Sequence, residues 1–233
     1  MHYSAFYGGN PLGSQERKEK AREQRRQDII EAAEKVFFDK GYDLATMDDV
    51  ARAAEFSKRT LYVYFSSKEQ IYFEIMTRGY KQLLQMLRDD KEKGDRSDAI
   101  GELKQMALTL HRFSLMYPDY FRAIMEYENG ELDFKNDVPD PSREACYELG
   151  EQVMGSLIGI LNKGIAEGSM RPDIHPENTA LILWACTVGV FNTAGKKGNY
   201  IRNYYKTTPE EFVAEAYALL IRTIRSGQGE GDR

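Results

Sequence analysis

Helical periodicity runs through almost the whole chain and constrains its fold more than any other feature. Apolar side chains recur at intervals of three and four residues, and no segment rich in valine and isoleucine alternates with polar residues as a half-buried strand would. We therefore predict an all-α fold of nine or ten helices. A length of 233 residues allows one compact unit together with a smaller one.

Capping residues, glycines and prolines set the expected helix boundaries. The first helix is predicted from Arg17 to Lys40 and ends at Gly41, because glycine readily adopts the left-handed conformation that follows many helices. The last helix is predicted to follow Thr208, where a hydroxyl cap, a proline and a glutamate are correctly spaced. The helices between them are predicted to start at Thr46, Ser57, Ser67, Ser97, Asp119, Ser142 and Pro176.

Composition and cysteine usage are those of an ordinary globular protein, with 42% hydrophobic and 30% charged residues. Cys146 and Cys186 lie in apolar runs, so we interpret them as buried thiols, with a redox switch as the alternative. The longest apolar run, Ala180 to Phe191, is shorter than the roughly 20 residues of a membrane span. The first residues lack a signal-peptide pattern, so we expect a cytoplasmic protein without membrane association.

Motifs for catalysis or metal binding are not found in the sequence. His2, His111 and His175 are far apart and do not have the spacing of metal ligands. There is no glycine-rich phosphate loop, no G-x-S-x-G turn and no Cys-x-x-Cys pair. We therefore expect no enzyme, no catalytic residue, no metal site and no cofactor.

The most informative segment contains two short, capped helices close together. Thr46-Met47-Asp48-Asp49 places a carboxylate three residues after a hydroxyl cap, and Ser57 can cap the second helix. A turn of three to four residues separates them, which is the spacing of a helix-turn-helix whose second helix enters the DNA major groove. Phe56, Leu61 and Phe65 are predicted to hold this second helix on the core.

Polar side chains around the second helix are candidates for DNA contact. Arg59 can pair with guanine through two hydrogen bonds, worth about 1–3 kcal/mol of discrimination. Lys68 is predicted to bind a phosphate, so its loss should weaken all DNA binding alike and flatten the salt dependence. Because the net charge is −5, affinity must come from a few placed cations. The DNA-binding candidates are Thr46, Ser57, Lys58, Arg59, Thr60, Tyr62, Tyr64 and Lys68.

The run S-K-R-T-L-Y-V-Y-F-S-S-K-E, residues 57–69, resembles the signature of the TetR/AcrR family of transcriptional regulators, and residues 25–46 fit as well. The resemblance implies an N-terminal three-helix helix-turn-helix domain and a C-terminal helical ligand-binding and dimerisation domain. Glu55 departs from the family pattern, which usually has glycine in the turn, and a left-handed backbone there would cost about 1–2 kcal/mol. Asp48 and Asp49 would repel phosphate unless they serve as caps.

The expected division of the chain follows from these motifs. Residues 17–66 form the DNA-binding domain and residues 67–227 the ligand-binding and dimerisation domain. Residues 1–16 are predicted to be a disordered arm or residues left from cloning, residues 129–141 a loop, and residues 228–233 a disordered tail. Basic residues between Arg17 and Arg26 are interspersed with glutamates, which favours a solvated helix face over an extension that touches DNA.

Aromatic and methionine side chains in the second domain are candidates for an adaptable ligand pocket, although each of them also suits an ordinary core. His111, Glu126 and Glu128 could add polarity, and the two glutamates would suit a cationic aromatic ligand. The pocket candidates are Phe113, Tyr117, Tyr120, Phe121, Met125, Tyr127, Met154, Leu157, Trp184 and Phe191.

An apolar helix after Pro176 and the stripe of the last helix indicate a second copy as partner, because Ala180 to Phe191 needs cover on every face. The family resemblance likewise implies a four-helix bundle between two copies. The expected dimer-interface residues are Leu183, Val190, Val213, Ala216, Tyr217, Leu220 and Ile224.

The sequence therefore predicts a ligand-responsive regulator, a repressor that binds a pseudo-palindromic operator in double-stranded DNA as a homodimer. A hydrophobic or aromatic small molecule is expected to release it from DNA. Two alternatives stay open: a DNA-bound protein that recruits another protein, and a helical carrier of a hydrophobic ligand that does not bind DNA.

Overall fold

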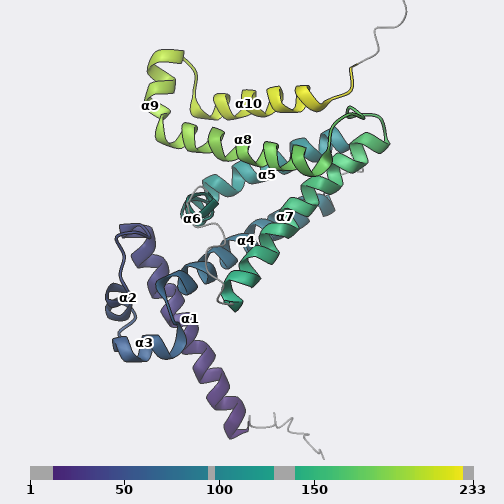
Figure 1. Cartoon of the computed structure of the whole chain (residues 1–233). Helices are drawn as coiled ribbons and strands as arrows, with labels where there is room; N and C mark the ends of the chain where they lie inside the picture. The colour runs from purple at the N-terminus through teal and green to yellow at the C-terminus, as the bar shows by residue number, and fades with distance from the viewer. Residues whose placement is uncertain (1–12, 94–97, 129–139, 228–233) are drawn as a thin grey trace, which may run out of the picture. The chain divides into compact units, whose positions relative to one another are not determined.

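The computed structural model describes residues 13–93, 98–128 and 140–227, and within these ranges the chain is all helical apart from turns and one isolated bridge (Figure 1). The predicted all-α fold is thus confirmed. The helices are α1 Ser14–Lys40, α2 Met47–Ala53, α3 Lys58–Tyr64, α4 Lys68–Lys93, α5 Ala99–Met116, α6 Pro118–Glu128, α7 Pro141–Ala166, α8 Pro176–Lys196, α9 Gly198–Tyr200, the π-helical turn η1 Ile201–Tyr205, and α10 Pro209–Ile224.

Two compact units make up the chain, and they meet in sequence between Ile75 and Met76. The predicted boundary at residue 66 is too early, because the first two turns of α4 pack into the first unit, where Tyr72 stacks against Tyr42. The predicted arm is shorter than expected, since α1 already begins at Ser14. Residues 1–12, most of the predicted loop after Glu128, and the predicted tail 228–233 lie outside the described residues.

Helices α1, α2 and α3 form the first unit around a small apolar core. Ile29 and Phe37 of α1, Val50 of α2 and Leu61 of α3 are buried there. Helix α2 begins with the predicted capping box: the Asp49 amide donates to the Thr46 hydroxyl at 3.1 Å, and the Thr46 amide donates to the Asp49 carboxylate at 3.1 Å. The two caps fix where α2 and α3 begin, and the buried side chains fix which faces they bury.

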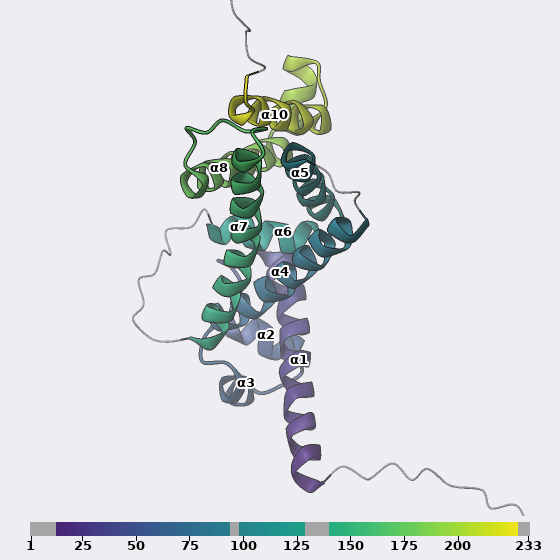
Figure 2. The same ribbon diagram turned by 90° about the vertical axis from the view of Figure 1, so that its right-hand side faces the viewer.

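The second unit is a helical bundle in which α5, α7, α8 and α10 surround a common core (Figure 2). Helices α8 and α10 lie side by side, and both pack against neighbours from the middle of the chain. Leu103, Leu157, Leu161 and Val188 are among the buried side chains. The predicted capping box at Thr208 is present, because the Glu211 amide donates to the Thr208 hydroxyl at 3.1 Å.

Helix ends differ from the prediction where the sequence carries no cap or proline. The segment from Gly198 to Tyr205 forms α9 and η1, which the sequence did not predict, and Lys206 ends it with a φ of +57°. The turn between α7 and α8 is tied to the end of α10, since the Arg171 amide donates to the Ile224 carbonyl at 2.9 Å. None of the described helices is both long and apolar enough to cross a bilayer.

Candidate functional site

Helix α3 is held on the first unit by its apolar side chains and by a cap. Leu61 and Phe65 are fully buried, as predicted, while Phe56 is only half-buried. Ser57 caps the helix by accepting the Thr60 amide at 3.0 Å. The guanidinium of Arg26 lies 5.1 Å from the centre of the Phe65 ring, so α1 braces the end of α3. The opposite face of α3 is thereby directed to solvent.

The outward face of α3 carries polar side chains, some of which already have partners within the protein. Lys58, Arg59 and Tyr62 are exposed, and Tyr64 is half-buried. Within the described part of the chain, Arg59 has no hydrogen-bond or ion-pair partner. Lys58, in contrast, forms an ion pair with Asp48 at 2.8 Å, and the hydrogen bond from this pair raises the pKa of Lys58. Arg59 is therefore the cation of α3 that is ready for a new partner.

The acidic pair at the start of α2 has two separate roles. Asp49 closes the capping box and accepts a hydrogen bond from Lys40 at 2.8 Å, and this bond is the main reason why the pKa of Asp49 falls to about 2. Asp48 neutralises Lys58 across the turn. The repulsion of phosphate that the sequence suggested is thus reduced, because both carboxylates already face a lysine.

Lys68, which was predicted to bind a phosphate, is held by backbone carbonyls in this structure. Its ammonium donates to the carbonyls of Tyr42 at 2.7 Å and Ala45 at 3.0 Å, and more distantly to that of Asp43 at 3.4 Å. It also lies 4.2 Å from the centre of the Tyr42 ring. Three carbonyls occupy the three N–H donors of a lysine. Lys68 therefore links the first turn of α4 to the loop before α2.

The turn between α2 and α3 keeps a left-handed residue at Glu55, although the cost of that conformation for a non-glycine residue had suggested an adjusted turn. Glu55 has a φ of +59°, in the left-handed region that favours glycine. The Phe56 amide donates to the Ala51 carbonyl at 2.9 Å, so the chain reverses tightly here. The geometry of the turn is thus kept although glycine is replaced by glutamate.

The N-terminal part of α1 presents both signs of charge beside the end of α3. Glu23 and Arg26 approach to 4.0 Å, and Arg26 also pairs with Glu74 of α4 at 2.5 Å. This mixture matches the expected solvated helix face. An open hollow on this surface is lined by Glu19, Lys20, Arg22, Glu23, Arg26 and Tyr64.

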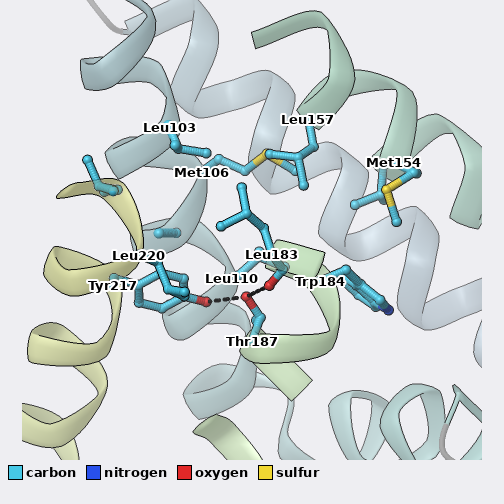
Figure 3. Close-up of a pocket in the computed structure, with 13 residues that line it drawn as sticks. Leu103, Met106, Leu110, Met154, Leu157, Leu183, Trp184, Thr187, Tyr217 and Leu220 are labelled. Atoms are coloured by element: carbon cyan, nitrogen blue, oxygen red, sulfur yellow. Dashed lines mark hydrogen bonds between the residues drawn. The ribbon is translucent and has the colours of Figure 1, made fainter. Parts of the chain in front are cut away.

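A small cavity of about 40 Å³ lies in the second unit between α5, α7, α8 and α10 (Figure 3). The Tyr217 hydroxyl donates to the Thr187 hydroxyl at 3.4 Å, which in turn donates to the Leu183 carbonyl at 2.8 Å. Burial raises the pKa of Tyr217 to about 12. The cavity is lined by Leu103, Met106, Ala107, Leu110, Val153, Met154, Leu157, Leu183, Trp184, Thr187, Tyr217, Leu220 and Ile221.

Most aromatic side chains that were predicted to line a pocket instead pack against one another. Of the ten candidates, only Met154, Leu157 and Trp184 line the cavity. Phe121 packs edge-on against Phe191, with ring centres 5.1 Å apart. The other candidates, which do not line the cavity, are Phe113, Tyr117, Tyr120, Phe121, Met125, Tyr127 and Phe191.

The polar candidates for that pocket are also placed elsewhere. His111 stacks on Phe191, with ring centres 5.9 Å apart, and Glu126 is exposed. The side chain of Glu128 lies outside the described part of the structure. Glu126 is not among the described residues that line the cavity.

The predicted dimer-interface residues of α8 and α10 mostly face the interior of their own chain. Val213 and Ile224 are buried, and Leu183 is both buried and part of the cavity lining. Tyr217 and Leu220 line the same cavity. A helical stripe identifies a buried face but not the partner that covers it, so the assignment of these residues to a dimer interface stays a prediction. The exposed apolar side chains of the two helices are Leu181, Ile182 and Leu219.

Comparison with known proteins shows that the first unit matches the model of a protein family. Residues 29–75 match the family model described as bacterial regulatory proteins of the tetR family. The matched segment spans the second half of α1, all of α2 and α3, and the first two turns of α4. It therefore contains the anchored α3 together with Lys68 and its carbonyl partners.

Curated relatives extend the similarity into the second unit. The chain is 37% identical over 173 residues to YfiR of Bacillus subtilis, named an uncharacterized HTH-type transcriptional regulator, which covers 70% of this chain and 74% of YfiR. It is 36% identical over 93 residues to FasR of Mycolicibacterium smegmatis, named an HTH-type transcriptional activator, covering 37% of this chain. The match to this chain covers less than half the length of two relatives: 41% of FasR and 45% of YuxN from Bacillus subtilis.

Solved structures share the fold over most of the chain. The ketosteroid transcriptional regulator KstR2 of Mycobacterium tuberculosis superposes with a TM-score of 0.59 at 20% identity, covering 87% of this chain and 95% of that one. AibR, solved in complex with isovaleryl coenzyme A and operator DNA, superposes with a TM-score of 0.60 at 17% identity, covering 84% and 98%. At these identities the likeness shows a common fold.

Proposed function

The chain belongs to the TetR family of transcriptional regulators, and from this premise we propose that it binds double-stranded DNA through α2 and α3 and responds to a small molecule in the cavity of its second unit. The observation that carries the proposal is the anchored α3, with Leu61 and Phe65 buried beneath it and Arg59 exposed without a partner among the described residues. The relatives are named as regulators, in line with the expectation that the chain is not an enzyme.

We assign the recognition of the DNA base sequence mainly to Arg59. A free guanidinium on the outward face of a short helix can donate two hydrogen bonds to one guanine in the major groove. Lys58 must first leave Asp48, so it contributes less to binding. Tyr62 and Tyr64 offer hydroxyls to phosphate oxygens, which position the helix without reading sequence.

Control by a ligand is supported by the cavity and by the relatives. AibR was solved with both isovaleryl coenzyme A and operator DNA, and in this chain the exposed α3 and the cavity lie in different units. A ligand shifts an equilibrium only by its differential affinity for the two states. A volume of about 40 Å³ is far below the roughly 300–1,000 Å³ of ligand pockets, so a ligand must bind a more open state.

Pairing of two copies is proposed through the outer faces of α8 and α10. The exposed fraction is 62% for Leu181 and 60% for Ile182 on α8, and 53% for Leu219 on α10. A two-fold pair would present two recognition helices to major grooves about 34–36 Å apart, which requires a pseudo-palindromic site. We propose that the bound dimer represses and that the ligand releases it.

The test of this function is a mobility-shift assay with fragments of double-stranded genomic DNA at low salt. Retarded fragments that share an inverted repeat, and that a bound ligand releases, are the expected result. A folded protein that retards no fragment would remove the DNA-binding function and leave a ligand carrier. A reporter gene placed behind the repeat distinguishes repression from activation, the activity named for FasR.

A further inference from the structure

The lining of the cavity carries very few polar atoms and no charge. Among the described residues that form it, ten are aliphatic or methionine side chains and none is Asp, Glu, Lys, Arg or His. The indole nitrogen of Trp184 lies on the side of its ring away from the two hydroxyls (Figure 3). The hydroxyls of Thr187 and Tyr217, which lie next to each other in the lining, are therefore the polar side-chain groups of the cavity (Figure 3).

The two hydroxyls differ in the length of the hydrogen bond that each one donates. Thr187 donates to the carbonyl of Leu183 in its own helix at 2.8 Å, a normal length for an O–H···O bond. Tyr217 donates to Thr187 at 3.4 Å, which is much longer than the usual 2.7–2.8 Å. The phenol of Tyr217 thus has a weak acceptor inside an apolar cavity, and a closer oxygen would be a better one.

The absence of charged side chains among the described lining residues disfavours ionised ligands at this site. A carboxylate taken out of water without a cation or a set of donors is strongly disfavoured, and the lining supplies only one weakly used O–H. An ammonium group would equally find no carboxylate among the described residues that line the cavity. The raised pKa of Tyr217 keeps the phenol neutral and able to donate at neutral pH.

We propose that the ligand of this cavity is an uncharged, mainly hydrocarbon molecule with one carbonyl or hydroxyl oxygen that accepts a hydrogen bond from Tyr217. The proposal rests on the ligand-controlled function above and names the class of its effector. Thr187 is then freed from its long contact with Tyr217, while its own bond to Leu183 is kept. Hydrocarbon contacts supply the affinity, and the Tyr217 hydroxyl supplies the selectivity.

Three probes of similar shape separate these contributions: isopropylbenzene, acetophenone and benzoate. Their dissociation constants are measured at pH 7 by calorimetry with the full chain. Acetophenone is expected to bind roughly fivefold more tightly than isopropylbenzene, the effect of one hydrogen bond. Benzoate, which is ionised at this pH, is expected to bind at least tenfold more weakly than acetophenone.

Two cavity variants and one control assign the selectivity to Tyr217. Tyr217→Phe should bind acetophenone and isopropylbenzene equally. Thr187→Val removes the weak acceptor of Tyr217 together with the bond to the Leu183 carbonyl, and should preserve the preference for acetophenone. Tyr204→Phe, at a tyrosine that is 76% exposed, should behave like the wild type. Thermal unfolding of each variant checks that it is folded.

The outcomes separate this proposal from the proposed function. Equal binding of acetophenone and isopropylbenzene by the wild type, tighter binding of benzoate, or no binding of any probe would overturn the assignment of the ligand class. An unchanged preference in folded Tyr217→Phe would overturn the role of Tyr217. Retardation of operator DNA, measured with the same samples, reports on the DNA-binding function independently of all these results.

Discussion

At the scale of single residues, the use of positive charge distinguishes contacts with DNA from contacts within the protein. Lys58 and Lys68 both belong to the motif that suggested DNA binding, yet Lys58 faces Asp48 and Lys68 is surrounded by backbone carbonyls. Arg59 lies between them in sequence and keeps its guanidinium in solvent. Of these three cations, Arg59 is the one that we propose for reading DNA, while Lys58 and Lys68 hold contacts within the protein.

Replacement of Arg59 by alanine should relax sequence preference. The affinity for the preferred duplex, selected from a random library, is expected to fall by about 1–3 kcal/mol, the worth of one bidentate contact to guanine. Binding to unrelated duplexes should change much less. Arg59→Lys keeps the charge but loses the planar fork, and so serves as the matched control. Equal losses on every duplex, measured by fluorescence anisotropy, would contradict base reading by Arg59.

Replacement of Lys68 by methionine should act on folding and not on phosphate binding. The carbonyls of Tyr42 and Ala45 lose a charged donor, so we expect the free energy of unfolding to fall by about 1–3 kcal/mol. DNA affinity should fall with an unchanged slope of log Kd against log salt concentration. If the slope of log Kd against log salt concentration flattened by about 0.9, Lys68 would instead contact a phosphate, as the sequence suggested. Arg22→Met on α1 is the control for general loss of charge.

At the scale of elements, helix α2 depends on its two ends. Its capping box and the Lys40–Asp49 ion pair fix the first turn, and the left-handed Glu55 fixes the reversal into α3. Because α2 has only seven residues, it cannot rely on its own helix propensity. Each end is therefore a place where a small chemical change should be measurable.

Acid should weaken α2 through Asp49. The pKa of Asp49 is lowered from 3.8 to about 2, chiefly by the hydrogen bond from Lys40, so the folded state favours the ionised carboxylate. This contribution to stability is present above pH 4 and is lost as the pH falls towards 2. Asp49→Asn should remove that part of the pH dependence of the melting temperature. Asp39→Asn, at an exposed site on α1, should leave it unchanged, and identical pH profiles for both variants would refute the effect.

Glycine at position 55 should stabilise the turn between α2 and α3. Glu55 has a φ of +59°, where a residue with a Cβ carries a penalty of about 1–2 kcal/mol that glycine avoids. Part of this gain is offset by the greater chain entropy of glycine, so we expect a net increase of about 0.5–1 kcal/mol in the free energy of unfolding. Ala54→Gly is the neighbouring control: its φ is −81°, so the substitution there should destabilise. Urea unfolding that ranks the two variants in the opposite order would contradict the argument.

At the scale of the whole molecule, the two units carry different tasks within one chain. The first unit contains the exposed Arg59, and the second contains the apolar cavity. Helix α4 begins in the first unit and ends in the second, so it provides a continuous connection in sequence between the two. The proposed dimer adds a third task to the second unit, on the faces of α8 and α10 that the cavity does not use.

A charge on the outer face of α8 should prevent pairing of two copies. Ile182→Glu places a carboxylate where an apolar interface is proposed, and we expect the mass measured by light scattering to fall from that of a dimer to that of a monomer. Leu115→Glu on α5, at a side chain of similar exposure, 63% against 60%, should remain dimeric. A monomeric wild type, or a dimeric Ile182→Glu variant, would exclude this interface.

Local sequence signals were sufficient for most of the helices and for the anchored α3, but not for α9 and η1. Hydroxyl caps at Thr46 and Thr208, the proline at 209 and the apolar period act over a few residues, so they determine where helices begin and which faces they bury. The family resemblance identified position 55 as the place where glycine is usual, and the structure has a left-handed backbone there. Sequence also identified the TetR family, because its signature lies in one continuous segment.

Tertiary structure alone decided which side chains meet across helices. Nothing in the local pattern shows that Lys68 reaches carbonyls more than 20 positions earlier, or that Leu183 and Tyr217 line a cavity. The aromatic side chains of α5 and α6 looked like a pocket but fill one another's space. The physical reason is that periodicity records the burial of a face, whereas its partner is chosen by how the helices pack.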